Sequence, residues 1–140
     1  MTITAFIVED SAPLRDSLVE ALAEIAGIRT VGTAASEHDA VAWLAQPTRD
    51  WNLAIVDLLL EGWGSGLGVL RATRQRRPDQ KVVVLTATAS PVVREQCLAL
   101  GCDAVFDKSM ESEALLAWCL QLAHAAGERR AGEAAKPSAG

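Results

Sequence analysis

The sequence predicts a three-layer α/β sandwich, in which a parallel sheet of five strands lies between two layers of helices. Short apolar runs rich in β-branched residues alternate with stretches of helical period five times between residues 1 and 126. The run Val82–Leu85 is apolar without a break, which is typical of a strand buried on both faces. A chain of 140 residues is also long enough to bury a core without a disulfide or a structural metal.

The first two repeats are bounded by residues that favour helix ends. Ile3–Val8 predicts the first strand, and the next helix begins at Ser11, whose hydroxyl can cap it, and ends at Gly27. Ile28–Gly32 predicts a weaker strand. A short helix over residues 36–45 then starts on a serine and stops before a proline.

The third and fourth strands carry the clearest signals. Leu53–Asp57 is an apolar strand that ends on an acid, and the glycine-rich loop Glu61–Gly66 follows it. We predict a helix over Leu67–Arg76, which a proline two residues further on closes. Lys81–Thr86 is the strongest strand of the chain.

The last repeats and the C-terminus are less regular. The pattern predicts a helix over residues 90–101, a strand Ala104–Asp107 and a final helix that Ser109 caps. From residue 127 onward the chain has no apolar periodicity. We therefore expect one domain over residues 1–126 and a disordered tail over 127–140.

Composition excludes several classes of protein. The chain has 13 Lys and Arg against 18 Asp and Glu, and the net charge of −5 disfavours nucleic acid as a main partner. No apolar run approaches the length of a membrane span, and no secretory signal opens the chain, so we expect a cytoplasmic protein. The three cysteines form no C-x-x-C pair, which argues against a zinc site or a disulfide framework.

Charged and hydroxyl residues follow the predicted strands. The first strand ends at Glu9 and Asp10, the third at Asp57, the fourth at Thr86, and Lys108 follows the fifth. In the flavodoxin-like strand order 2-1-3-4-5 the three acids converge beyond the carboxyl ends of neighbouring strands. Three carboxylates and one lysine leave a charge of −2, which suits a hard divalent cation such as Mg²⁺ or Mn²⁺.

Taken together, these residues resemble those of a response-regulator receiver domain of two-component signalling over about Thr2–Ala126. Each feature alone is weak evidence, but all of them in order on this architecture are specific. The features are the acidic pair Glu9-Asp10, then Asp57, Thr86, Gly101 and Lys108.

The resemblance implies a function in phosphoryl signalling. Asp57 would accept a phosphoryl group from the phosphohistidine of a sensor histidine kinase or a phosphotransfer protein. Lys108 would pair with Asp57 and then with a phosphoryl oxygen, and Thr86 would donate its hydroxyl to the same group. The output surface implied is the face of the fourth helix, fifth strand and fifth helix, which is also a candidate homodimer interface.

The metal ligands also follow from the resemblance. Asp10 would bind Mg²⁺, or alternatively Mn²⁺, directly, and Glu9 would bind it through a water molecule. Asp57 would supply a third ligand, and the backbone carbonyl of Leu59 would complete the protein's share. An apolar side chain suits position 59 because only its backbone would be used.

The chain departs from the family pattern in three places. The aromatic switch residue that is common three positions before the lysine is replaced by Val105, with Phe106 beside it. Ser109 stands where a proline commonly follows the lysine. After Asp57, Leu60-Glu61 replaces the usual Met-Pro, and the loop that follows is one residue longer than is common. This loop contains Trp63, which either contacts a kinase, gates access to the site, or is folded back on the surface.

Our main interpretation is a single-domain response regulator that signals through a protein effector, with no DNA-binding domain and no catalysis beyond its own phosphorylation and dephosphorylation. One alternative is a receiver-like module that acts by constitutive protein contact. A second is an aspartyl-phosphate phosphatase, which is disfavoured because Asp57-x-Leu59 lacks a second acid as general acid. The glycine-rich loop does not fit the G-x-G-x-x-G nucleotide motif.

Overall fold

The computed structural model describes residues 3–135, which alternate between strand and helix along their whole length. The elements are β1 Thr4–Val8, α1 Ala12–Ala26, β2 Arg29–Ala34, α2 Glu37–Leu44, β3 Leu53–Val56, α3 Gly66–Ala72, β4 Lys81–Thr86, α4 Pro91–Ala99, β5 Ala104–Asp107 and α5 Ser112–Ala135.

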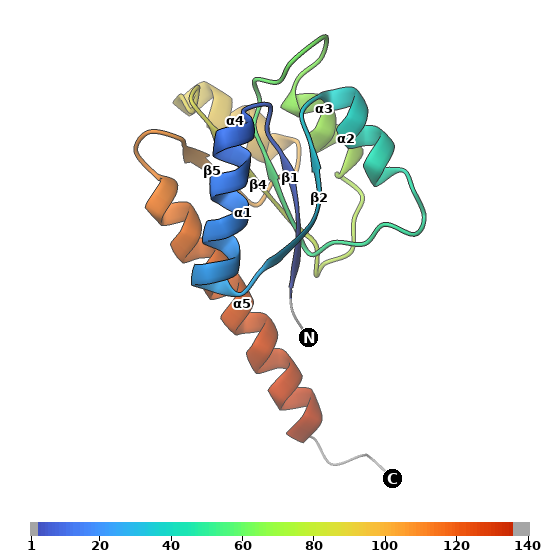
Figure 1. The fold of residues 1–140 in the computed structure, drawn as a ribbon, viewed down its shortest axis with the longest axis vertical. Helices are drawn as coiled ribbons and strands as arrows, with labels where there is room; N and C mark the ends of the chain where they lie inside the picture. The colour runs from blue at the N-terminus through green and yellow to red at the C-terminus, as the bar shows by residue number, and fades with distance from the viewer. Residues whose placement is uncertain (1–2, 136–140) are drawn as a thin grey trace.

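The strands form one parallel sheet in the order β2-β1-β3-β4-β5. This confirms the predicted flavodoxin-like αβα sandwich. Helices α1 and α5 lie side by side on one face of the sheet, and α2, α3 and α4 cover the other (Figure 1). Each crossover places a helix against the sheet, as the right-handed connection of parallel strands requires.

Alternation along the strands divides the core in two. In β1, Phe6 and Val8 pack beneath α2, α3 and α4, whereas Ala5 and Ile7 face α1 and α5. All four residues have at most 1% of their surface exposed. Because both faces of the sheet are covered, the strands can be apolar throughout, as the run in β4 predicted.

Hydroxyl caps set the starts of several helices. Ser11, Ser36 and Ser90 accept hydrogen bonds from Leu14, Asp39 and Val93 N–H, as the sequence predicted. Gly27 ends α1 in the left-handed conformation at φ 65°, which a residue with a Cβ adopts only at a cost.

Two predicted boundaries around α3 and α5 are wrong. Helix α3 ends at Ala72 because Thr73 turns its hydroxyl back onto the carbonyls of the preceding turn. Helix α5 starts at Ser112, and Ser109 does not cap it. Instead the Asp107 carboxylate accepts the N–H groups of Ser109 and Met110, which forms a separate turn before the helix.

The end of α5 differs from the expectation as well. The helix continues past Gly127 to Ala135, so the predicted disordered tail is wrong over residues 127–135. Alanine, glutamate and arginine are strong helix formers even where no apolar stripe marks them. Residues 136–140, the rest of the predicted tail, lie outside the described residues. Within residues 3–135, no helix is both long and apolar enough to cross a membrane.

Candidate functional site

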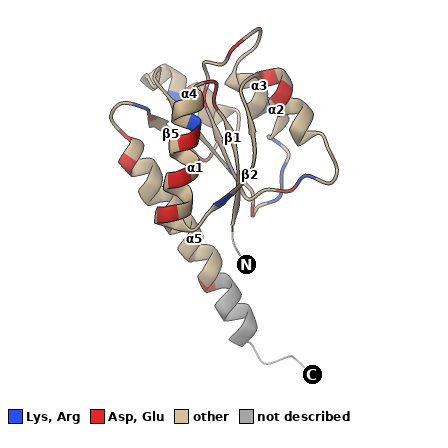
Figure 2. Ribbon diagram, in the orientation of Figure 1, with Lys and Arg blue, Asp and Glu red and all other residues tan. Residues whose placement is uncertain are grey.

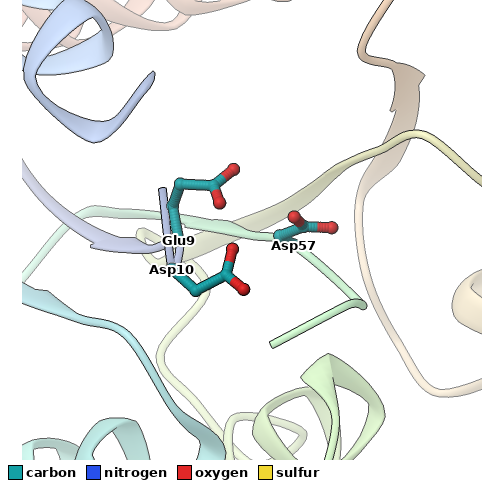
Figure 3. A group of neighbouring side chains, drawn as sticks. All are labelled: Glu9, Asp10 and Asp57. Atoms are coloured by element: carbon teal, nitrogen blue, oxygen red, sulfur yellow. The ribbon is translucent and has the colours of Figure 1, made fainter. Parts of the chain in front are cut away.

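Three carboxylates gather at the carboxyl edge of the sheet. Glu9 and Asp10 follow β1 and Asp57 follows β3, and their side chains extend into one region (Figure 3). One ligand oxygen from each lies within 4.8 Å of the others. The convergence follows from the pairing of β1 with β3, in which the Asp57 N–H donates to the Val8 carbonyl at 2.9 Å. The structure therefore brings together the acids that the sequence predicted to meet.

Lys108 joins this cluster from the end of β5. Its Nζ lies 2.6 Å from Asp57 Oδ2 and 2.6 Å from Glu9 Oε1. Glu9 and Asp57 are 2% and 4% exposed, so one shared cation offsets two buried negative charges. Asp10 is exposed at the rim. The three carboxylates and the lysine together leave a charge of −2, as predicted.

The pKa values reflect this arrangement. Burial raises the pKa of Glu9, and the hydrogen bonds from Lys108 and the Ser11 N–H only partly oppose it. Burial acts on Lys108 to lower its pKa, but the hydrogen bonds to Asp57 and Glu9 outweigh burial and raise it. Lys108 is therefore charged at neutral pH.

An all-oxygen cluster of residual negative charge fits a hard divalent cation better than a soft metal. Leu59 lies beside the cluster, where its N–H donates to Asp57 Oδ1 at 3.2 Å. Leu59 is 56% exposed, so its apolar side chain is not part of the core. The metal role of the Leu59 carbonyl stays a prediction.

Thr86 ends β4 and is fully buried at the same edge. Its hydroxyl makes a hydrogen bond of 3.1 Å with the Thr88 hydroxyl, and its carbonyl accepts the Lys108 N–H at 3.0 Å. Thr86 thus connects the loop after β4 to the lysine, and its hydroxyl is engaged by Thr88.

A model of the response regulator receiver domain matches residues 5–119. The chain belongs to this family. A curated relative, the photosynthetic apparatus regulatory protein RegA of Cereibacter sphaeroides, is 30% identical over 95 residues. That match covers 68% of this chain and 49% of RegA, so the chain spans about half the length of this relative.

Solved structures agree on the fold. A CheY-like receiver domain protein from Methanospirillum hungatei has a TM-score of 0.75 at 23% identity, over 92% of this chain and 99% of that one. A response regulator from Burkholderia pseudomallei, solved with a phosphorylated aspartic acid, a calcium ion and citrate, has a TM-score of 0.72 at 24% identity, over 94% and 74%. Membership of the family implies a divalent metal at the acidic pocket.

The receiver domain holds Glu9 in place through contacts that sequence reasoning missed. The Glu9 carboxylate accepts the Ser11 N–H at 3.0 Å, and its backbone carbonyl accepts a guanidinium N–H of Arg15 at 2.9 Å. Arg15 lies near the start of α1, six residues after Glu9. A basic residue so soon after the acidic pair was the sequence feature from which this contact could have been predicted.

The loop after Asp57 packs against the backbone of the acid itself. A Cβ on Gly66 would lie 2.1 Å from the Asp57 carbonyl oxygen, so only glycine allows this approach. Glu37, the first residue of α2, accepts the Ser65 N–H at 2.8 Å. Its carboxyl occupies the space beside Gly68, where a Cβ would lie 2.2 Å from Glu37 Cδ. Trp63, at the tip of the loop, is 98% exposed.

On the opposite side of the pocket, Arg94 of α4 links three segments. Its guanidinium donates to the Ala89 carbonyl at 3.3 Å and the Val105 carbonyl at 2.8 Å, and it pairs with the Glu111 carboxylate. Glu111 also accepts the Asp107 N–H at 3.1 Å, and Arg94 lowers the pKa of the Glu111 carboxyl. One side chain therefore connects the loop after β4, strand β5 and the start of α5.

The residues at the usual aromatic switch position are both buried. Val105 and Phe106 are each 8% exposed, and they pack on opposite faces of the sheet. Neither presents an aromatic ring at the surface of α4 and β5.

Proposed function

We propose that this receiver domain accepts a phosphoryl group on Asp57 from the phosphohistidine of a sensor histidine kinase or a phosphotransfer protein, in a Mg²⁺-dependent reaction. The observation that carries the proposal is the 2.6 Å contact of Lys108 with an Asp57 that shares its pocket with Glu9 and Asp10. The proposal assigns the domain no catalysis beyond its own phosphorylation and dephosphorylation, and it places the reaction in the cytoplasm.

The chemistry is an in-line displacement at phosphorus. An Asp57 carboxylate oxygen forms the new O–P bond, the P–N bond to the imidazole breaks, and its electron pair stays on the imidazole, which takes up a proton. Glu9, Asp10, Asp57 and the Leu59 carbonyl would hold Mg²⁺, which when bound supplies positive charge to the phosphoryl oxygens. Mn²⁺ could bind to the same ligands in place of Mg²⁺.

The protein's own groups orient the acceptor. The Leu59 N–H holds Asp57 Oδ1, and Lys108 holds Oδ2. After transfer, Lys108 is free to donate to a phosphoryl oxygen, because Glu9 still offsets its charge. Fixing the nucleophile before the donor arrives lowers the entropic part of the barrier.

Arg94 gives the signal a path to the output face. In our proposal, the Thr86 hydroxyl leaves Thr88 for the phosphoryl group and draws the loop after β4 with it. That loop carries the Ala89 carbonyl, which Arg94 binds together with Val105 and Glu111. The shift would therefore reach α4, β5 and α5 without a switch aromatic, and would alter the surface offered to an effector or a second copy of the domain.

The test is phosphorylation of the full chain by acetyl phosphate with Mg²⁺, followed by intact mass. We expect one added phosphoryl group, its loss in Asp57→Ala and its loss in EDTA. Asp39→Asn, an exposed acid in α2, is the matched control and should be labelled like the wild type. Labelling that persists in Asp57→Ala would refute the assignment of the acceptor.

A constitutive binding module is the second candidate, because Val105 lacks an aromatic ring and Trp63 offers a fully exposed apolar surface. Tryptophan fluorescence separates the two functions, with Trp63→Phe identifying the signal of that residue. A change on adding Mg²⁺ and phosphodonor supports phosphorylation. An unchanged spectrum at saturation, together with unaltered mass, favours the binding module.

A further inference from the structure

A cavity of about 790 Å³ lies at the edge of the sheet opposite the acid cluster. Its lining includes Thr4 and Arg29, which begin β1 and β2, and Asn52, which precedes β3. All strands of a parallel sheet begin at one edge and end at the other. The length of β1, roughly 16 Å at about 3.3 Å per residue, therefore separates this cavity from Glu9.

Three arginines and two aspartates, Asp50 and Asp79, line the cavity and leave it a net charge of +1. Of the arginines, Arg77 pairs with both aspartates, donating to Asp50 Oδ1 at 2.8 Å and to Asp79 Oδ1 at 3.0 Å. Within residues 3–135, neither Arg29 nor Arg49 has a carboxylate at ion-pairing distance. Figure 2 shows basic positions at the start of β2 and in the neighbouring loops, in a chain whose net charge is −5.

One of these arginines is held in place by an aromatic stack. The Trp43 ring lies flat on Phe6 with centroids 4.1 Å apart, in space that Gly32 leaves open, since a Cβ there would be 2.6 Å from the indole. The Arg49 guanidinium lies 5.5 Å from the Trp43 ring centroid, and its Nε donates to Gln46 Oε1 at 3.0 Å. These contacts leave its terminal nitrogens as donors and hold them at the cavity.

We propose that this cavity binds a nucleoside phosphate, with its phosphates on Arg29 and Arg49. A guanidinium matches phosphate oxygens in pairs. The volume lies within the range of about 300–1,000 Å³ typical of small-molecule sites, far more than a lone phosphate fills. Val31 supplies apolar surface for a base, and the Trp43 ring, which stacks on Phe6, lines the same cavity. The Asn52 carboxamide oxygen accepts the Thr4 N–H, so its NH₂ remains to donate to a base or ribose.

The test is calorimetry of the full chain with AMP, ATP, GMP and GTP, and with inorganic phosphate as the small probe. EDTA is present throughout, so that the acid cluster and its metal take no part and the result is independent of Asp57 chemistry. We expect at least one nucleotide to bind at one site, more tightly than phosphate. Arg29→Gln and Arg49→Gln should each weaken binding about ten- to hundredfold, because each removes a charged hydrogen bond.

Arg71→Gln, an exposed arginine on α3 outside the cavity, is the matched control and should bind as the wild type does. Arg29 and Arg49 are exposed, so their variants are expected to fold, and circular dichroism checks this. The proposal is overturned if no nucleotide binds at millimolar concentration, if phosphate binds as tightly as the nucleotides, or if the Arg71 variant loses affinity equally.

Discussion

The two loops that carry the reactive groups are built differently. The loop after β3, which follows Asp57, is fixed by close backbone packing at Gly66 and by the half-buried hydrogen bond from the Ser65 N–H to the Glu37 carboxylate. The loop after β5, which carries Lys108, is held by exchangeable polar contacts, namely the Asp107 turn and the Arg94–Glu111 pair. Backbone packing has one arrangement, whereas ion pairs can be remade at small cost. We therefore expect the loop after β3 to resist rearrangement more than the loop after β5 does.

Gly66→Ala should give the largest effect, because it disturbs the backbone packing of the loop after β3 directly. The new Cβ would meet the Asp57 carbonyl oxygen at 2.1 Å and the Leu58 Cα at 2.8 Å, both of them backbone atoms that cannot rotate away. We expect a loss of about 1–3 kcal/mol in unfolding free energy. Displacement of Asp57 by about 1 Å should slow labelling by acetyl phosphate about 100-fold.

Gly127→Ala is the matched control for this substitution, because a Cβ there meets nothing within 4 Å. It lies inside α5, so the alanine should stabilise the helix by about 0.5–1 kcal/mol and leave labelling unchanged. If Gly66→Ala were labelled at the wild-type rate, the acceptor loop would not be rigid and the contrast between the loops would fail.

Glu37→Ala tests the second anchor of the same loop and should have an intermediate effect. The Ser65 N–H loses its acceptor, which should cost about 1 kcal/mol in unfolding free energy. Labelling of Asp57 should slow by a few fold. Glu37→Gln keeps an acceptor oxygen at the same reach and should restore both quantities. Equal losses in the two variants would mean that the charge, and not the hydrogen bond to Ser65, is what Glu37 supplies.

The contrast between the loops also explains what the sequence could and could not predict. The alternation of strands and helices follows from the hydrophobic periodicity of the sequence, which is a local pattern. Glu9 and Asp57 meet because each follows a strand of a parallel sheet, and the carboxyl ends of such strands lie together. Glu37 and Arg94 escaped prediction because their partners lie 28 and 17 residues away and meet them only once the helices have docked.

The boundaries of α5 were missed for two further physical reasons. At its start, the Asp107 carboxylate competes for the backbone N–H groups that Ser109 was expected to organise. At its end, residues 127–135 form helix although no apolar stripe marks them. Periodicity detects a helix by its apolar stripe, and the sequence of residues 127–135 carries no such stripe.

Glu111→Gln should give the smallest effect, and it tests the movable loop. Arg94 and the Asp107 N–H hold the pKa of the Glu111 carboxyl below its ordinary value of 4.5. A lowered folded-state pKa adds stability above the unfolded value, and this stability is lost as pH falls through the folded value. The wild type should therefore melt slightly higher than Glu111→Gln at pH 7, and the difference should shrink as the pH falls below 4.5 and vanish once the pH lies below the folded-state pKa.

Amide hydrogen exchange would locate the part of the protein that the Arg94–Glu111 pair stabilises. In Glu111→Gln, the amides of α4 and of the turn at Asp107 should exchange faster at neutral pH, while the loop after Asp57 should not change. Glu113→Gln, an exposed acid in the first turn of α5, is the control and should show neither the pH-dependent melting difference nor faster exchange in α4. Faster exchange spreading to residues 57–66 would show that the two loops move as one unit, and that the signal does not leave the pocket through Arg94 alone.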